Sequence, residues 1–111
     1  MEQMTSELRL QQENRAYMGS GGRSQENRRA GFRPAFFDVQ TETVYPSCYA
    51  DGQSAPFHSL DGLPEELVVS RTAAGRVATV KASIISGFVL EGLFYTRDEA
   101  AQTFSRQRLA A

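Results

Sequence analysis

The change in composition near residue 30 most limits what this chain can fold into. Residues 1–30 are dominated by Gln, Asn, Glu, Arg, Ser and Gly and hold few large apolar side chains. Apolar and aromatic residues gather in 31–111, and a chain of this length forms one domain at most. A domain this small buries roughly two-thirds of its unfolded surface, so its core is small. We predict a flexible tail over residues 1–30 and a single domain over residues 31–111.

The tail has one segment of helical pattern. Residues 5–18 begin with a threonine and a serine, which are good N-caps, but their apolar stripe is thin. An isolated helix of that length is marginal in water, and the glycines within 19–22 break it. We expect either a solvated tail with one nascent helix or a helix that folds onto a partner. In the second case it would present Leu8, Leu10 and Tyr17.

A β-hairpin is predicted at the start of the domain. The run 35–40 favours a strand, 41–43 a turn, and 44–45 a second strand. Pro46 stops that second strand, because proline cannot donate a hydrogen bond to a β-ladder.

Further strands are predicted between residues 67 and 95. Residues 67–69 have the pattern of a buried strand, and 77–82 alternate with the period of two typical of a sheet with one solvated face. Residues 83–87 continue as a strand or form a single helical turn. Two apolar triplets in 88–95 flank an acidic residue and Gly92, which favours a two-residue hairpin.

The C-terminal helix has the clearest local signal. Thr96 is a good N-cap and Glu99 stands three residues later, which is the pattern of a capping box. We expect the helix to run to about Gln107, with Ala100 and Phe104 facing the sheet. The predicted fold class is therefore α+β, a small antiparallel sheet of four to six short strands with one C-terminal helix packed on it and a disordered N-terminal tail.

A long irregular segment interrupts the domain over residues 47–64. Glycine and proline divide it into turns, and long loops in small domains are often functional. We expect Tyr49, Phe57 and Leu60 to tuck under the sheet and keep this loop ordered.

The charges and the single cysteine restrict the class of protein. The net charge is −1, with five arginines against four glutamates in residues 1–30 and seven basic against nine acidic side chains in the rest. The lone Cys48 excludes an intramolecular disulfide and a zinc site built from several cysteines. No apolar leader segment follows Met1, and the apolar runs fall short of the ~20 residues of a membrane span. We expect a cytoplasmic bacterial protein.

Candidate catalytic and metal-binding residues are few. His58 is the only histidine and lies ten positions after Cys48, so the two form either a nucleophile with its base or a buried thiol and a surface histidine. The latter interpretation is favoured, because no third member of a catalytic group is recognisable. The acidic residues within 51–66 lack the spacing of a calcium loop, and the glycines within 19–22 lack the ending of a phosphate loop. We expect no catalytic site, no cofactor and no bound metal.

Aromatic residues are the main candidates for a binding surface. Ten of them follow residue 30, and a two-layer core is too small to absorb them all. Phe36 and Phe37 are adjacent, so on a strand they point to opposite faces. An exposed aromatic patch indicates a recognition site or an oligomer interface, unless the long loop covers it. The predicted partner-binding residues are Phe36, Phe37, Tyr49, Phe57 and His58.

A group of arginines near the junction of tail and domain supports an alternative. Their guanidinium groups could bind the phosphates of a nucleic acid, although neither part of the chain is strongly basic. The predicted nucleic-acid-binding residues are Arg23, Arg28, Arg29 and Arg33.

Several segments resemble those of a group of bacterial proteins. They are Gly31–Phe36, Asp61–Glu66, Gly87–Val89 and Phe94–Ala100. Over roughly residues 31–101 the chain resembles small uncharacterised accessory proteins of proteobacterial plasmids, integrative elements and prophages. The resemblance implies a protein that binds a host protein or DNA. We expect a non-enzymatic protein-binding or adaptor protein encoded by a mobile element, with nucleic-acid binding as the alternative, and the sequence leaves the partner and the oligomeric state open.

Overall fold

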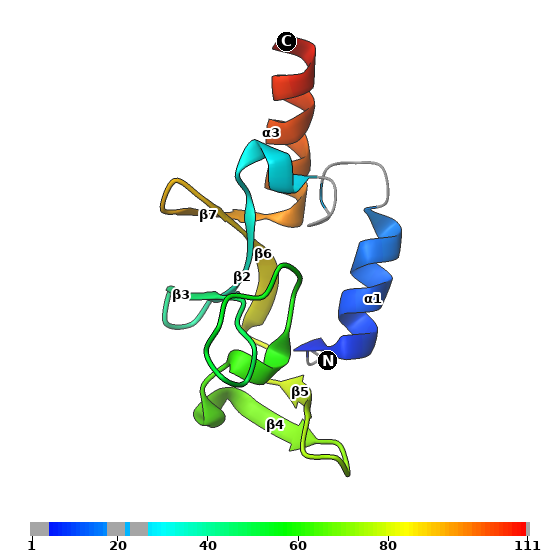
Figure 1. Ribbon diagram of the computed structural model, residues 1–111, viewed down its shortest axis with the longest axis vertical. Coiled ribbons are helices and arrows are strands. Elements are labelled where there is room, and N and C mark those ends of the chain that lie inside the picture. Colours follow the sequence, from blue (N-terminus) through cyan, green and yellow to red (C-terminus); the bar gives the residue numbers. More distant parts are fainter. Residues whose placement is uncertain (1–4, 18–21, 23–26, 111) are drawn as a thin grey trace.

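The structure is a computed structural model that describes residues 5–17, 22 and 27–110. Its helices are α1 (Glu7–Ala16) and α3 (Arg97–Ala110), with short 3-10 helices at Arg28–Ala30, Leu60–Gly62 and Glu65–Leu67. Its strands are β1 (Thr5–Ser6), β2 (Arg33–Asp38), β3 (Thr43–Pro46), β4 (Val68–Arg71), β5 (Val77–Val80), β6 (Ile84–Leu90) and β7 (Leu93–Thr96). The molecule measures 46 × 29 × 27 Å, with α3 at one end of the long axis and β4 and β5 at the other (Figure 1).

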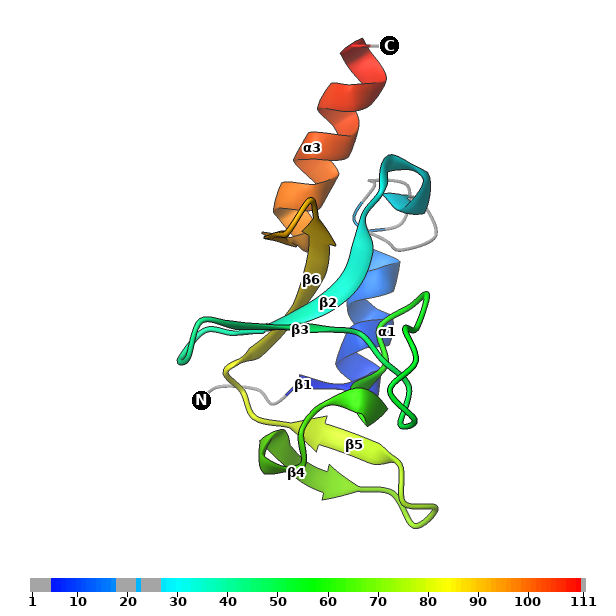
Figure 2. The same ribbon diagram turned by 60° about the vertical axis from the view of Figure 1, so that its left-hand side comes forward.

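Two antiparallel sheets organise the domain. The larger has the strand order β3-β2-β6-β7, and the smaller has the order β1-β5-β4. Helix α3 contacts β6 and β7 and projects beyond the larger sheet (Figure 2). Helix α1 lies alongside that sheet (Figure 2). The predicted α+β fold, with a small antiparallel sheet and a C-terminal helix packed on it, is confirmed.

Both predicted hairpins form, because the local sequence supplies their turns. The Asp38 carboxylate accepts a hydrogen bond from the backbone N–H of Gln40 at 2.9 Å, which closes the turn between β2 and β3. Glu91 and Gly92 both have positive φ, 52° and 81°, as a two-residue turn between strands requires. Residues 83–87 belong to a strand from Ile84 onward, which decides between the two alternatives for this segment.

Two strand predictions need correction in detail. The segment 67–69 is not a buried strand, because only Leu67 is buried and β4 pairs with β5 alone at the edge of the smaller sheet. The simple alternation in 77–82 also fails, since Val77 and Val80 are both buried. The register of β5 against β4 is irregular, as in a β-bulge, and this changes the period of two.

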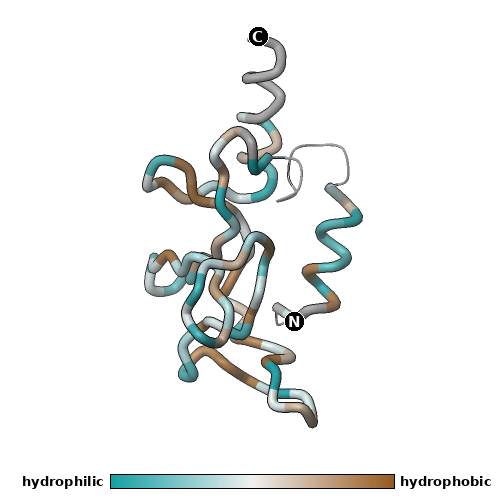
Figure 3. Tube along the Cα trace, viewed as in Figure 1, coloured by the Kyte–Doolittle hydropathy of each residue, from teal (hydrophilic) through white to brown (hydrophobic). Residues whose placement is uncertain are grey.

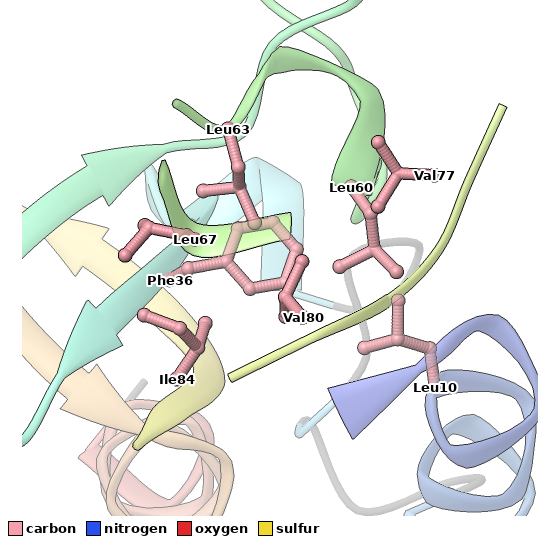
Figure 4. Close-up of a cluster of buried hydrophobic side chains, with 8 residues drawn as sticks. All are labelled: Leu10, Phe36, Leu60, Leu63, Leu67, Val77, Val80 and Ile84. Carbon is pink, nitrogen blue, oxygen red and sulfur yellow. The ribbon is translucent and has the colours of Figure 1, made fainter. Parts of the chain in front are cut away.

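The hydrophobic core has two parts. The larger cluster joins α1, the larger sheet, the long loop and the smaller sheet, and it consists of Leu10, Phe36, Leu60, Leu63, Leu67, Val77, Val80 and Ile84 (Figure 4). The smaller cluster consists of Phe32, Phe88 and Ala100, and it attaches α3 to the larger sheet. Ala100 therefore faces the sheet as predicted, whereas the side chain of Phe104 lies outside the described residues.

Helix α1 forms where the sequence predicts a short helix. Ser6 caps it, because its hydroxyl oxygen accepts a hydrogen bond from the backbone N–H of Arg9. The helix is mostly hydrophilic apart from its first turns (Figure 3), and Leu10 is buried against the domain. The flexibility of residues 1–30 stays a prediction, and 1–4, 18–21 and 23–26 lie outside the described residues.

The capping box of α3 is present as predicted. The Thr96 hydroxyl accepts from the backbone N–H of Glu99 at 3.1 Å, and the Glu99 carboxylate accepts from the backbone N–H of Thr96 at 2.9 Å. We expect Thr96→Ala to lower the free energy of unfolding by about 1 kcal/mol, because the cap is lost. Thr96→Ser keeps the hydroxyl and serves as the control. Urea denaturation checks both, and an alanine variant as stable as the serine variant would contradict the cap's contribution.

Candidate functional site

A buried arginine organises the polar centre of the molecule. Arg97, in the first turn of α3, is only 3% exposed. Its Nε donates to the Glu13 carboxylate at 2.9 Å and to the Ser86 hydroxyl at 3.2 Å, and its Nη1 donates to Asn14 Oδ1 and to the carbonyl of Gly22, both at 2.9 Å. A buried charge with several hydrogen bonds ties together segments that are distant in the sequence.

Arg97 also reaches the only histidine of the chain. Its Nη2 lies 3.2 Å from Nδ1 of His58, and Nε2 of that ring lies 2.7 Å from the carbonyl oxygen of Gly87. A carbonyl can only accept, so the proton sits on Nε2 and Nδ1 accepts from the guanidinium. The ring packs edge-to-face against Phe36 and Phe88, with centroids 5.4 and 5.2 Å away. His58 is thus a neutral core residue, which corrects the interpretation of it as a surface histidine.

The surroundings of His58 make stability depend on pH. Burial and the neighbouring Arg97 guanidinium lower its pKa from 6.5 to about 3. Between these values the unfolded chain binds a proton at His58 that the folded chain does not, so the contribution of His58 to stability falls as the pH drops below 6.5 and is constant above it. Because the chain has one histidine, we expect a loss of up to about 1.4 kcal/mol per pH unit between pH 6.5 and 5.

Urea denaturation at several pH values between 7.5 and 5 measures this loss. His58→Gln is the control, since it removes the titrating group and should flatten the slope in that interval. A wild-type chain equally stable at both ends of the interval would show that His58 is accessible to protons in the folded state.

A cavity of about 540 Å³ lies between α1 and the start of α3. Charges of both signs line it, because Arg9 and Arg97 stand there with Glu13 and Asp98. The hydroxyl of Tyr17 donates to Asp98 at 2.5 Å, and this hydrogen bond raises the pKa of Tyr17 to about 12. These charged and polar groups already pair with one another. The cavity is therefore part of the polar contact between α1 and the rest of the domain.

The predicted partner-binding residues separate into buried and exposed groups. Phe36 is fully buried and His58 is buried, so these two side chains lie in the core and do not reach the surface. Phe37 points to the opposite face of the sheet, as its position next to Phe36 predicts, and stacks on Phe94 with ring centroids 5.1 Å apart. Gly87 makes room for this stack, because an added Cβ would overlap the ring of Phe94.

Tyr49 and Phe57 lie on the outside of the long loop. Phe57 is 52% and Tyr49 37% exposed, and their rings pack edge-to-face with centroids 5.8 Å apart. The expectation that both tuck under the sheet is wrong, and of the three residues named for that role only Leu60 is buried.

The loop is ordered by hydrogen bonds and not by packing of these two aromatic side chains under the sheet. The Ser47 hydroxyl donates to the carbonyl of Phe57 at 2.8 Å and accepts from the backbone N–H of Ser59 at 2.7 Å. The backbone N–H of Ala55 donates to the carbonyl of Ser47, and residues 48 and 54 form an isolated β-bridge. The loop is therefore a preformed scaffold that keeps the Tyr49–Phe57 pair at the surface.

A cavity of about 350 Å³ is lined in part by the same loop. Its lining residues come from the tail junction, from β2 and β6, and from the loop: Arg28, Phe32, Arg33, Pro34, Pro46, Ser47, Ser54, Ala55, Pro56 and Val89. Arg28 is held there by a hydrogen bond of 3.0 Å from its Nη2 to the carbonyl of Pro56. We call this cavity together with Tyr49 and Phe57 the loop surface.

Two of the four predicted nucleic-acid-binding arginines thus meet at one place. Arg28 and Arg33 line the same cavity, although five positions separate them in the sequence. Arg23 and the side chain of Arg29 lie outside the described residues.

The other candidate residues show no assembled site in the described part of the chain. The thiol of Cys48 donates to the carbonyl of Pro46 at 3.4 Å, and His58 has its own partners in the core. Among the described residues, no three or more His, Cys, Asp and Glu side chains are grouped so that they could hold a metal ion. Nor does any described helix have the length and apolar character to cross a membrane.

Comparisons with protein-family models, with curated proteins and with solved structures found no match.

Sequence reasoning missed Arg97. The capping box correctly places it at the first position of α3, where an arginine is normally solvated. Its burial depends on α1 and the loop folding over it, and no local pattern reports such a contact.

Proposed function

We propose that this protein is a non-enzymatic protein-binding or adaptor protein that docks its partner on the loop surface. The observation that supports the proposal most is the exposed pair of Tyr49 and Phe57 on a loop held by its own hydrogen bonds. Aromatic residues with large exposed areas are enriched at the centres of protein interfaces. A preformed loop also loses little conformational entropy on binding.

The surroundings of the pair resemble the anatomy of a binding site. The loop that carries the two rings also lines a largely apolar cavity, and Arg28 and Arg33 stand at that cavity. Arginine and aromatic residues together are the commonest hot-spot residues of interfaces. The resemblance to accessory proteins of bacterial mobile elements, which implies binding to a host protein or to DNA, is compatible with an adaptor role.

Nucleic-acid binding is the second candidate, and the convergence of Arg28 and Arg33 favours it. Arginines can bind phosphates, and exposed aromatic rings can stack on bases. This function predicts binding of a labelled oligonucleotide that weakens steeply as salt is added. Absent or salt-insensitive binding would exclude it.

Co-purification from a bacterial host tests the proposed function. A tagged wild-type chain is expected to retain a partner protein that a Tyr49→Ser/Phe57→Ser variant loses, because the exposed rings are gone. Leu93→Ser is the matched control, since Leu93 is 63% exposed but is the first residue of β7 and does not line the cavity. Far-UV circular dichroism confirms that all three are folded. Retention of nothing by the wild type, or of the same partner by the double variant, would refute a docking role for this surface.

A further inference from the structure

We propose that the cavity of the loop surface binds an extended acidic peptide segment of the partner and takes one apolar side chain of it between Arg28 and Arg33. This inference rests on the proposed function and specifies the chemistry of the partner. Three properties of the described residues support it: the apolar lining of the cavity, its unneutralised positive charge, and its size.

The walls of the cavity suit a single apolar side chain. They are built mainly from rings and short apolar groups, namely Phe32, Pro34, Pro46, Ala55, Pro56 and Val89. A volume of about 350 Å³ is at the lower end of the range for ligand pockets, which matches one residue of a peptide and its immediate backbone. Prolines contribute rigid walls without backbone N–H groups, so entry of an apolar group leaves few donors unsatisfied.

The charge at the cavity is positive, and none of the ion pairs among the described residues neutralises it. Four other arginines form ion pairs with carboxylates of the chain, namely Arg9, Arg71, Arg76 and Arg97. In the described part of the chain, Arg28 bonds only to a backbone carbonyl and Arg33 has neither an ion pair nor a hydrogen bond from its side chain. Among the residues that the structure describes, no carboxylate lines the cavity. A carboxylate of the partner would therefore complete charge-assisted, two-pronged hydrogen bonds there.

Polar groups at the cavity suit the backbone of an extended segment. Ser54 lines it and is exposed. Ser47, in contrast, is fully used by the loop, because its hydroxyl both donates to the carbonyl of Phe57 and accepts from the N–H of Ser59. Ser54 is therefore the hydroxyl that is available for a backbone group of a bound peptide.

A peptide fits these properties better than a nucleic acid does. Affinity for nucleic acids comes mainly from several basic groups that track the phosphates. Here two guanidinium groups stand at an apolar cavity on a chain of net charge −1. Two cations suit a short run of carboxylates, and a small, largely apolar cavity suits a side chain more than the flat face of a base.

Fluorescence anisotropy with a defined probe tests the inference. The probe is a short fluorescein-labelled peptide of glutamate and aspartate with one central leucine, titrated with the full chain. We expect saturable binding that weakens about tenfold or more in Arg28→Glu and in Arg33→Glu, because each change replaces an attraction with a repulsion. Arg15→Glu is the matched control and should leave binding unchanged, since Arg15 is an exposed arginine on α1 that does not line the cavity.

Three further probes separate the possible results. Replacing the central leucine of the peptide with serine should weaken binding at least severalfold. If the acidic peptide does not bind, if it binds Arg33→Glu as tightly as wild type, or if a labelled oligothymidine binds in its place, the inference is overturned. Binding of a neutral leucine peptide with the same affinity also overturns it, yet leaves the proposed function standing. Loss of partner retention in Tyr49→Ser/Phe57→Ser, measured separately, keeps the two ideas distinguishable.

Discussion

Replacing Arg97 with alanine is expected to lower the free energy of unfolding by about 3–5 kcal/mol. The guanidinium is buried and is hydrogen-bonded to Glu13, Asn14, Ser86 and His58. Its removal takes the Arg97 donor away from Asn14 and from Nδ1 of His58. The partly buried Glu13 carboxylate keeps Arg9 and the Ser86 hydroxyl as partners. Each polar group that loses its donor carries a desolvation cost. For a domain with a typical total stability of about 5–15 kcal/mol, a loss of this size is severe.

Thermal and urea unfolding of Arg97→Ala, Arg97→Lys and Arg15→Ala measure this effect. Lysine keeps the positive charge but lacks the planar fork, so it should recover only part of the stability. Arg15→Ala removes an exposed arginine and should stay within about 0.5 kcal/mol of the wild type. If Arg97→Ala unfolds at the same urea concentration as Arg15→Ala, the buried cluster does not support the fold.

Phe36→Ala is expected to have an effect of similar size, about 3–5 kcal/mol, because it empties the centre of the larger core cluster. The neighbouring Phe37 provides a matched control with the same chemistry on the opposite face of the sheet. Phe37 is half-buried and stacks on Phe94, so its truncation should cost only about 1–2 kcal/mol. Urea denaturation of the two variants under one set of conditions gives the comparison. Equal losses would contradict the assignment of Phe36 to the core and Phe37 to the outer face.

The sequence predicted the elements whose signals are local. The turn at Gly92, the box of Thr96 and Glu99 and the stop at Pro46 each need only neighbouring residues, and the structure has all three. The opposite directions of Phe36 and Phe37 follow from strand geometry alone.

The sequence did not predict features that depend on packing between distant segments. Whether His58 is buried depends on Arg97, 39 positions away, and no periodicity connects them. The exposure of Tyr49 and Phe57 follows from loop hydrogen bonds made by Ser47. The hydrophobicity of the two residues alone therefore led to the incorrect prediction that they are buried under the sheet. The meeting of Arg28 with Arg33 at one cavity likewise required the folded chain.

The cluster around Arg97 has a consequence for the order of events during synthesis. Glu13 and Arg97 are 84 positions apart, and His58 lies 39 positions before its arginine. At translation rates of about 5–20 residues per second, Arg97 is synthesised several seconds after Glu13 and His58. Until Arg97 leaves the ribosome, the nascent chain cannot close its polar centre, although every member of the larger core cluster precedes that residue. We expect ribosome-bound chains truncated before residue 97 to remain sensitive to protease, and full-length chains to become resistant in one step.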